Sequence, residues 1–273
     1  MQRSPPVHLT LGKPPRGSLF EAGQFSSCLS GAKCIELHEP GTRRGGLQAS
    51  SPFVNGSGPY IDKIITIATP YRGSLKAIEA LLPGARNFFG LEAQKAMRRA
   101  SRTLPGVYQL LPSWEKAAVD KHSGKHIDIF TQDVWQDNLV KTLAKEYGKT
   151  FFQAMLDDAR AFTDVVKQDY NTDIRKRFYC VYGVGSETWK QVKVDPRNGN
   201  RFDFEKAAED KRGDGTVHKL SSYVKAAGFF KDTKKFIELG GQHAQMPNHG
   251  AVQDYIVALF TKSKYLRPFE SKP

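Results

Sequence analysis

The sequence lacks any uninterrupted apolar stretch of the roughly 20 residues that a membrane-spanning helix needs. Its first residues, MQRSPPVHLT, also lack the continuous apolar core of a secretory signal. Cysteine is scarce, because only Cys28, Cys34 and Cys180 are present, and their spacing matches no zinc motif. These absences argue against a disulfide framework, a signal peptide and a membrane anchor. We therefore expect a cytoplasmic protein in a reducing compartment.

Negative charge is also in short supply. The chain has 28 acidic against 41 Lys and Arg residues, a net charge of +13. Such an excess suits a negatively charged partner, either nucleic acid or an anionic membrane surface, although a solvated basic surface explains it as well. The basic residues are scattered rather than interleaved with aromatic residues that could stack on bases. We therefore expect no nucleic-acid partner and keep an anionic membrane surface as an alternative.

The N-terminal part of the chain differs in composition from the rest. Residues 1–57 are rich in Pro, Gly and Ser and show neither the helical nor the strand periodicity of apolar residues. We expect this segment to be disordered or unrelated to the rest, and residues 1–40 to make few contacts with the folded part. Residues 58–265 are predicted to form the folded domain.

Within that domain, apolar runs alternate with helical patterns. Strands are predicted over 61–70, 126–130, 177–183 and 235–239, and helices over 133–147, 152–166 and 252–259. Residues 188–194 alternate in polarity and are expected to pair as a hairpin with residues near Phe202, across a turn at 195–200. Strands that alternate with helices are typical of an α/β fold with a mainly parallel sheet.

Two polar residues follow predicted strand regions at positions suited to catalysis. Asp214 stands between two glycines, which allow a tight turn that can present a carboxylate, although an Asp-Gly turn is also common without any function. His243 lies between the last strand and the last helix, where it could face a ligand at the sheet edge or simply the solvent. His249 is a competing candidate, but its place at a helix start is explained by capping. The chain order acid then histidine is that of the α/β-hydrolase triad.

Several motifs carry a specific resemblance. They are the acid motif Gly213–Val217 with Leu220–Ser222, the strand and turn Ile65–Ser74, the segment Leu104–Pro112, and His243 with Met246, Val252 and Ile256. Together they resemble the lecithin:cholesterol acyltransferase family of lipases and acyltransferases over about residues 58–262. The resemblance implies an α/β-hydrolase fold that is incomplete on its N-terminal side, with a helical cap over residues 75–125.

The resemblance also implies a chemistry. A serine would attack a lipid-like acyl ester, His243 would act as general base and then general acid, and Asp214 would orient the imidazole. The substrate would be a lipid or acyl ester, and no metal or organic cofactor is expected.

The nucleophile of that family is missing. The family places it in a G-x-S-x-G elbow, and no such motif occurs in the chain. Ser57 lacks the spacing, and Ser74 is expected to cap a helix. The stretch Gly41–Leu47 keeps the glycines but puts Arg43 at the serine position. We therefore expect a hydrolase that is inactive in this chain. The alternative is a non-catalytic remnant of the fold that binds a lipid, an anionic surface or a protein partner.

Overall fold

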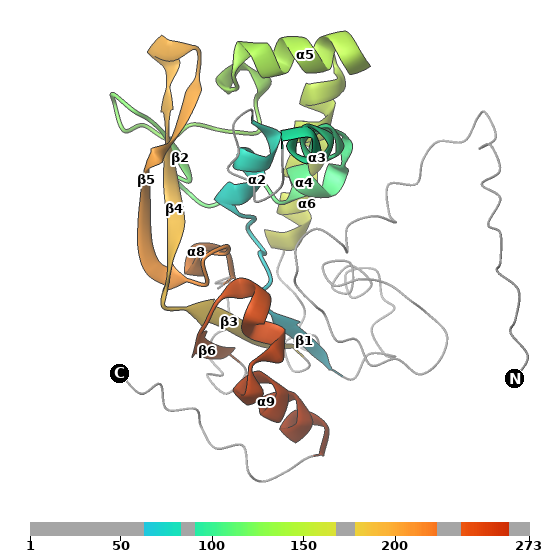
Figure 1. Ribbon diagram of the computed structural model, residues 1–273, viewed down its shortest axis with the longest axis vertical. Coiled ribbons are helices and arrows are strands. Elements are labelled where there is room, and N and C mark those ends of the chain that lie inside the picture. The colour runs from blue at the N-terminus through green and yellow to red at the C-terminus, as the bar shows by residue number, and fades with distance from the viewer. Residues whose placement is uncertain (1–62, 83–90, 168–177, 223–235, 262–273) are drawn as a thin grey trace, which may run out of the picture.

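The computed structural model describes residues 63–82, 91–167, 178–222 and 236–261 (Figure 1). The predictions for residues 1–57, including the position of Arg43, lie outside the described residues. Within the described ranges, no helix has the length and apolarity needed to cross a membrane. The fold has two three-stranded sheets and combines parallel strands with helices, so it is of the α/β class.

The first sheet is parallel throughout. It consists of β1 (Ile64–Ile67), β3 (Phe178–Val184) and β6 (Phe236–Gly240), in the order β1-β3-β6. Helix α9 (Gly250–Thr261) packs on one of its faces. The buried residues of this contact are Ile65, Ile67, Ala68, Val181, Met246, Val252, Tyr255 and Leu259. Three of the predicted strands are therefore confirmed as neighbours in one parallel sheet.

The second sheet is mixed, which the sequence did not predict. It contains β2 (Ala118–Asp120), β4 (Ser186–Asp195) and β5 (Arg201–Gly213). Strands β4 and β5 form an antiparallel hairpin with Val194 opposite Phe202, as predicted, while β2 runs parallel to β4. The hairpin turns through the short helix η3 (Pro196–Asn198), where the Asp195 side chain accepts a hydrogen bond from the Arg197 backbone.

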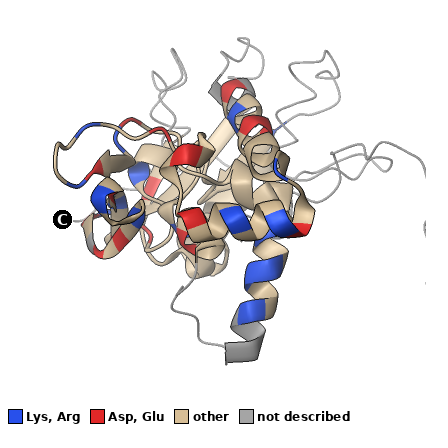
Figure 2. Cartoon of the chain, turned by 90° about the horizontal axis from the view of Figure 1, so that it is seen from above, with Lys and Arg blue, Asp and Glu red and all other residues tan. Residues whose placement is uncertain are grey.

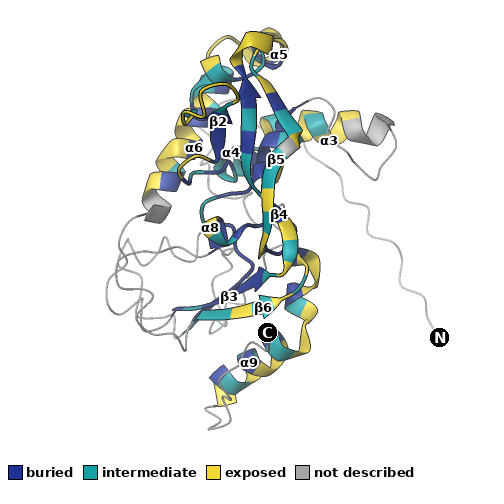
Figure 3. Ribbon diagram, turned by 90° about the vertical axis from the view of Figure 1, so that its left-hand side faces the viewer, coloured by how far each residue is buried: buried dark blue, intermediate teal, exposed yellow. Residues whose placement is uncertain are grey.

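A second core lies between this sheet and a group of helices. The helices are α2 (Leu75–Leu81), α3 (Leu91–Thr103), α4 (Pro105–Gln109), α5 (Asp137–Tyr147) and α6 (Phe151–Lys167). Helix α6 confirms the predicted amphipathic helix, because Phe152 and Leu156 are fully buried. Trp135 meets Phe152 edge-on, with ring centroids 5.5 Å apart. Figure 3 shows the buried residues on the inner sides of these elements. The described residues of the predicted cap (75–125), which are 75–82 and 91–125, lie within this unit.

One predicted strand is wrong, and one predicted helix begins later than expected. Residues 126–130 do not form a strand beyond one isolated bridge between His126 and Val119. The reason is that Asp128 accepts a hydrogen bond from the Phe130 backbone and pairs with Arg160, which closes a turn instead. The helix predicted from residue 133 begins at 137, because a short helix, η2 (Gln132–Val134), precedes it and two extended residues, Trp135 and Gln136, separate the two.

The β4–β5 hairpin interrupts the first sheet and then returns to it. The chain leaves the carboxyl end of β3 at Gly185, whose positive φ of 91° makes the turn into β4. At the end of β5, Gly213 lies opposite Ser186, so the chain comes back to the point where it left. The residue after Gly213 is Asp214, which is thereby placed at the carboxyl end of β3.

Candidate functional site

Asp214 lies in a tight loop whose backbone binds one of its carboxylate oxygens. The side chain is 2% exposed, and Oδ1 accepts hydrogen bonds from the amides of Thr216 at 3.0 Å and Val217 at 2.7 Å. The turn needs a glycine at position 215, where φ is +84°. The Gly215 amide in turn donates to Thr188 Oγ1 on β4 at 2.8 Å. The loop thus holds the carboxylate in one orientation, with Oδ2 directed elsewhere.

That second oxygen meets His243. The histidine follows β6 and begins the short helix η6 (His243–Asn248), and it is 9% exposed. Its Nδ1 lies 2.9 Å from Asp214 Oδ2, and its backbone amide donates to the Asp214 carbonyl oxygen at 2.9 Å. The predicted contact between the two side chains is therefore present. Because an ionised carboxylate only accepts, Nδ1 carries the proton, and Nε2 is the nitrogen with a lone pair.

The approach of the acid loop to the parallel sheet requires a glycine in β3. A Cβ atom on Gly183 would lie 2.6 Å from the Asp214 Cβ and 3.3 Å from the Met246 sulfur. No ordinary side chain fits there without displacing the acid loop. Gly183 therefore allows Asp214, from the loop after β5, and the η6 segment, from the end of β6, to meet over the same strand.

The other candidate residues have local roles. His249 caps α9, because the Ala251 amide donates to its Nδ1 at 3.3 Å. Ser74 caps α2, as predicted, by accepting from the Lys76 amide. Its hydroxyl also donates to the Thr216 carbonyl at 2.6 Å, which ties the start of α2 to the acid loop. Arg43 and Ser57 lie outside the described residues.

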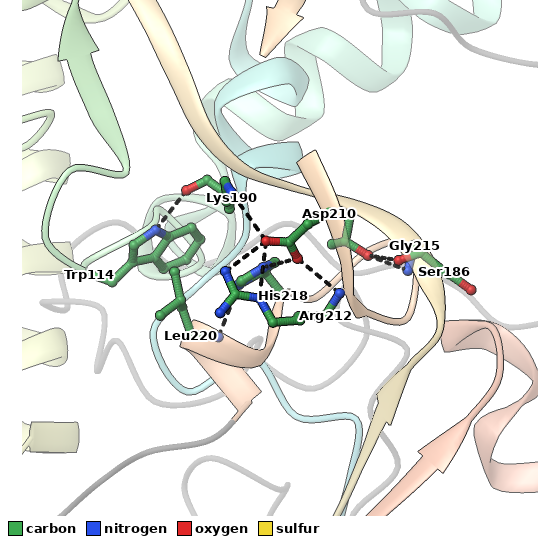
Figure 4. Close-up of polar contacts among 9 residues, drawn as sticks. Trp114, Ser186, Lys190, Asp210, Arg212, Gly215, His218 and Leu220 are labelled. Atoms are coloured by element: carbon green, nitrogen blue, oxygen red, sulfur yellow. Dashed lines mark hydrogen bonds and ion pairs between the residues drawn. The ribbon is translucent and has the colours of Figure 1, made fainter. Parts of the chain in front are cut away.

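A second histidine–aspartate pair was missed at the sequence level. Figure 4 shows Lys190, Arg212 and His218 converging on the carboxylate of Asp210. His218 is 1% exposed, and its Nε2 lies 2.9 Å from Asp210 Oδ1. The Leu220 amide donates to its Nδ1 at 3.1 Å, so Nε2 carries the proton and donates to Asp210. A backbone bridge between Gly213 and His218 closes the acid loop just beside this pair.

The charges of this cluster favour an ionised aspartate and a neutral histidine. Hydrogen bonds from Arg212, together with those from His218 and Lys190, hold the pKa of Asp210 well below its usual range despite its partial burial. Burial lowers the pKa of His218, and this effect exceeds the opposing attraction of Asp210. The only sequence signal was the position of His218 directly after the acid motif, since nothing in the pattern of β5 indicates that Asp210 points toward it.

The described residues contain no group of three or more His, Cys, Asp or Glu side chains that could hold a metal ion. The arrangement offers instead a buried carboxylate and an imidazole whose proton lies on the carboxylate side. Such a pair can accept a proton at Nε2 while the carboxylate stabilises the resulting cation.

Part of the chain matches a known protein family. A search of curated proteins found no significant relative. Residues 53–174 match the sequence model of the lecithin:cholesterol acyltransferase family. This range includes β1 and the helices α2 to α6, and it ends before β3, so Asp214 and His243 lie beyond it. Over residues 53–174, the chain is thus similar to the lecithin:cholesterol acyltransferases, a family of α/β-hydrolase fold that acts on lipids.

Proposed function

We propose that the chain derives from a lipid acyl-ester hydrolase or O-acyltransferase in which Asp214 and His243 are the acid and the base. The observation that carries this proposal is the buried 2.9 Å contact between the two side chains. Both residues stand at the carboxyl ends of parallel strands, where α/β folds bind their ligands. The family segment supplies the substrate class, a lipid with an acyl ester.

In the complete mechanism, a serine hydroxyl attacks the ester carbonyl while His243 Nε2 takes its proton. Asp214 stabilises the imidazolium through Nδ1–H. The imidazolium then returns the proton to the departing alkoxide, which leaves as an alcohol, and an acyl-enzyme remains. Water or a second alcohol attacks the acyl-enzyme by the same route. Water completes hydrolysis, whereas an alcohol completes acyl transfer.

We further propose that this chain performs no serine-dependent turnover. The sequence contains no G-x-S-x-G elbow, and the stretch that keeps its glycines has Arg43 at the nucleophile position. A guanidinium cannot form the acyl-enzyme. Asp214 and His243 would then remain in place without a serine hydroxyl to deprotonate.

A serine-directed fluorophosphonate probe tests the inactivity on the full chain and, if a serine is labelled, also the role of His243. The samples are the wild type, His243→Ala and the heat-denatured wild type, with circular dichroism to show that the first two are folded. We expect no labelling of any sample. Labelling of one serine that disappears in His243→Ala would overturn the inactivity and support the role of His243. Labelling that persists in His243→Ala would overturn the role of the histidine.

The second candidate function is a non-catalytic lipid-binding protein, favoured by the absence of the elbow motif. It predicts binding of an ether-linked phospholipid, which cannot be hydrolysed, without any probe labelling. Isothermal titration calorimetry of the folded chain would measure that binding directly. If the folded chain does not bind the ether lipid, this second candidate function fails.

A further inference from the structure

A cluster of charged and polar side chains lies beside the acid loop (residues 214–217) and takes no part in the acid–base chemistry of Asp214 and His243. It is the group drawn in Figure 4 around the carboxylate of Asp210. Figure 2 shows that Lys, Arg, Asp and Glu residues occur on many elements of the protein. This cluster differs from a surface ion pair because His218 is 1% exposed, so water hardly competes for its hydrogen bond to Asp210.

The side chain of His218 connects the two ends of the acid loop. Strand β5 leads into the loop, and His218 follows directly after it. Its Nε2 donates to Asp210 Oδ1 on β5 at 2.9 Å, and a backbone bridge joins Gly213 to His218. Asp210 is in turn held from β4, because Lys190 Nζ lies 3.2 Å from its Oδ2. The imidazole therefore ties the exit of the loop to the strand that enters it.

His218 also caps the helix that follows the loop, α8 (Lys219–Ser222). Its carbonyl oxygen accepts from the Ser221 amide at 2.8 Å, and its Nδ1 accepts from the Leu220 amide at 3.1 Å. Both bonds satisfy amides at the start of a helix, as a capping residue does. The two ring nitrogens thus serve different neighbours, since Nδ1 holds α8 and Nε2 holds β5. A substitution can therefore remove one bond and keep the other.

The orientation of the Asp214 carboxylate depends on the residues just before His218. Asp214 Oδ1 accepts from the amides of Thr216 and Val217, and the Asp214 amide donates to the Val217 carbonyl at 3.3 Å. Because Val217 directly precedes His218, a displacement of His218 also moves an amide that holds the carboxylate. The other oxygen, Oδ2, which contacts His243, would then turn away from it.

We propose that His218 is a positioning residue, which together with Asp210 fixes the acid loop so that the Asp214 carboxylate stays directed at His243. This proposal rests on the proposed function for the roles of Asp214 and His243, and it adds a residue that acts only through Asp214. It also gives a reason for placing a buried histidine directly after the acid motif.

The acid loop has a second anchor, so loss of the His218 contact should loosen the loop without releasing it. The Gly215 amide donates to Thr188 Oγ1 on β4 at 2.8 Å, and this bond does not involve His218. We therefore expect the contact between Asp214 and His243 to open more often when His218 no longer reaches its partner on β5.

The test compares His218→Asn with His218→Gln in the full chain, two amides that differ by one methylene group. Asparagine can accept from the Leu220 amide and so keeps the cap of α8, but it is too short to reach Asp210. Glutamine can reach Asp210 and donate to it. The control is His122→Asn, which removes a contact of the same kind. His122 Nε2 lies 3.0 Å from Asp195 Oδ1, at the end of β4 away from the acid loop.

The readout is the Nδ1 proton of His243, measured by nuclear magnetic resonance of protein with ¹⁵N-labelled histidine. In His218→Asn this proton should exchange with water about tenfold faster, equivalent to about 1.4 kcal/mol, the scale of a hydrogen bond to a charged group. His218→Gln and His122→Asn should stay close to the rate of the wild type. Thermal melts establish that each variant is folded at the temperature of measurement. Asp210→Ala replaces His218→Asn if that variant does not fold, with the same expected increase.

The possible outcomes separate the positioning role from the proposed chemistry, because the measurement needs neither a serine nor a substrate. An unchanged rate in His218→Asn would overturn the positioning role alone. Equal increases in His218→Asn and His218→Gln would also overturn it, because the bond to Asp210 would then not matter. An equal increase in His122→Asn would overturn it as a general effect of losing such a contact. Absence of the His243 resonance in the wild type would overturn the contact with Asp214, and with it both proposals.

Discussion

The carboxylate of Asp214 accepts hydrogen bonds from three directions, two from its own loop and one from His243. Asn in its place can keep the loop bonds through its oxygen, and its amide nitrogen then faces His243. A donor facing a donor is unfavourable, so the imidazole must move its proton from Nδ1 to Nε2.

We therefore predict that Asp214→Asn switches the tautomer of His243. The free energy of unfolding should fall by about 1 kcal/mol, because a hydrogen bond between neutral groups replaces one to a charged carboxylate. Nuclear magnetic resonance of protein with ¹⁵N-labelled histidine reports the tautomer, and urea unfolding reports the stability. Asp254→Asn, an exposed carboxylate on α9, serves as the control and should change neither. Nδ1 still protonated in Asp214→Asn would contradict the geometry.

The arginine at position 43 is consistent with a frameshift in the gene, caused by the loss of one base. Loss of one C from GGC CAC TCG ACG GG, which encodes Gly-His-Ser-Thr-Gly, gives GGC ACT CGA CGG G, which encodes Gly-Thr-Arg-Arg, the residues at 41–44. A second compensating shift would restore the glycines that follow. We predict that any residual esterase rate is small and does not change in Arg43→Ala, because arginine forms no acyl-enzyme. Resequencing across codons 30–60 decides the origin. If no one-base change there opens a frame for G-x-S-x-G, the history is wrong.

The buried His218 predicts a pH dependence of stability. Its pKa is lowered in the folded protein, whereas the unfolded chain has an ordinary histidine pKa of about 6.5. Between these two values the unfolded state binds more protons, so the free energy of unfolding rises with pH and levels off above about 6.5. As the pH falls through this window, the contribution of His218 is lost. Protonation also removes the acceptor for the Leu220 amide.

His218→Gln isolates this effect. Glutamine can donate to Asp210 from its amide and does not titrate, so the rise of stability over this window should become shallower. Urea unfolding at a series of pH values measures the slope. His126→Gln, a residue at the surface loop after β2, is the control and should keep the slope of the wild type. An unchanged slope in His218→Gln would mean that His218 is not the group responsible.

At the scale of the elements, β3 provides the surface on which the acid loop and η6 meet. Gly183→Ala puts a methyl group 2.6 Å from the Asp214 Cβ. We predict a loss of about 1–3 kcal/mol in the free energy of unfolding, the usual range for overpacking, together with a weakened Asp214–His243 contact. Gly240→Ala in the neighbouring strand meets nothing within 4 Å and should be nearly neutral. Thermal melts and the Nδ1 proton resonance of His243 distinguish the two variants. Equal effects of Gly183→Ala and Gly240→Ala would contradict the close approach of Gly183 to Asp214.

Most strands of the parallel sheet, and helix α6, were predictable because the apolar residues of each follow one simple pattern. The continuous apolar residues of β1 and β3 indicate buried strands, and the periodicity of α6 indicates a helix that packs on a core. The strand predicted at 126–130 failed because the Asp128 side chain bonds its own turn, a local interaction that periodicity does not register.

The candidate site, too, was predictable from the sequence only in part. Asp214 and His243 were predictable because both follow strand ends and their motifs resemble a known family. Asp210 and His218 were not, because their contact depends on where the C-terminal end of β5 lies relative to the residue before α8 (Lys219–Ser222). The division into two sheets was also missed. The alternating pattern indicates the hairpin, but it does not say that the hairpin joins β2 rather than β3.

At the scale of the whole molecule, the parallel sheet has open edges among the described strands. Strand β1 pairs with β3 alone, and β6 also pairs with β3 alone. Unpaired edges favour association with other chains, while the net charge of +13 opposes it. We therefore predict self-association that increases with concentration and also with salt, which screens the repulsion. Sedimentation velocity at low and high salt measures it. A monomer at all concentrations in high salt would contradict the prediction.

The path of the chain through the two sheets also affects the order in which the two parts of the molecule fold. The core around Tyr108 draws on residues between Leu75 and Phe202, so many of its contacts are close in sequence. The parallel sheet must instead join β1, β3 and β6 across that whole stretch, and closing such long loops is slow. During refolding, the helical core can therefore consolidate first, while the parallel sheet, and with it the contact between Asp214 and His243 after β6, forms later. The Nδ1 proton resonance of His243 would then report when β6 and η6 have docked on β3, a step that follows the helical core.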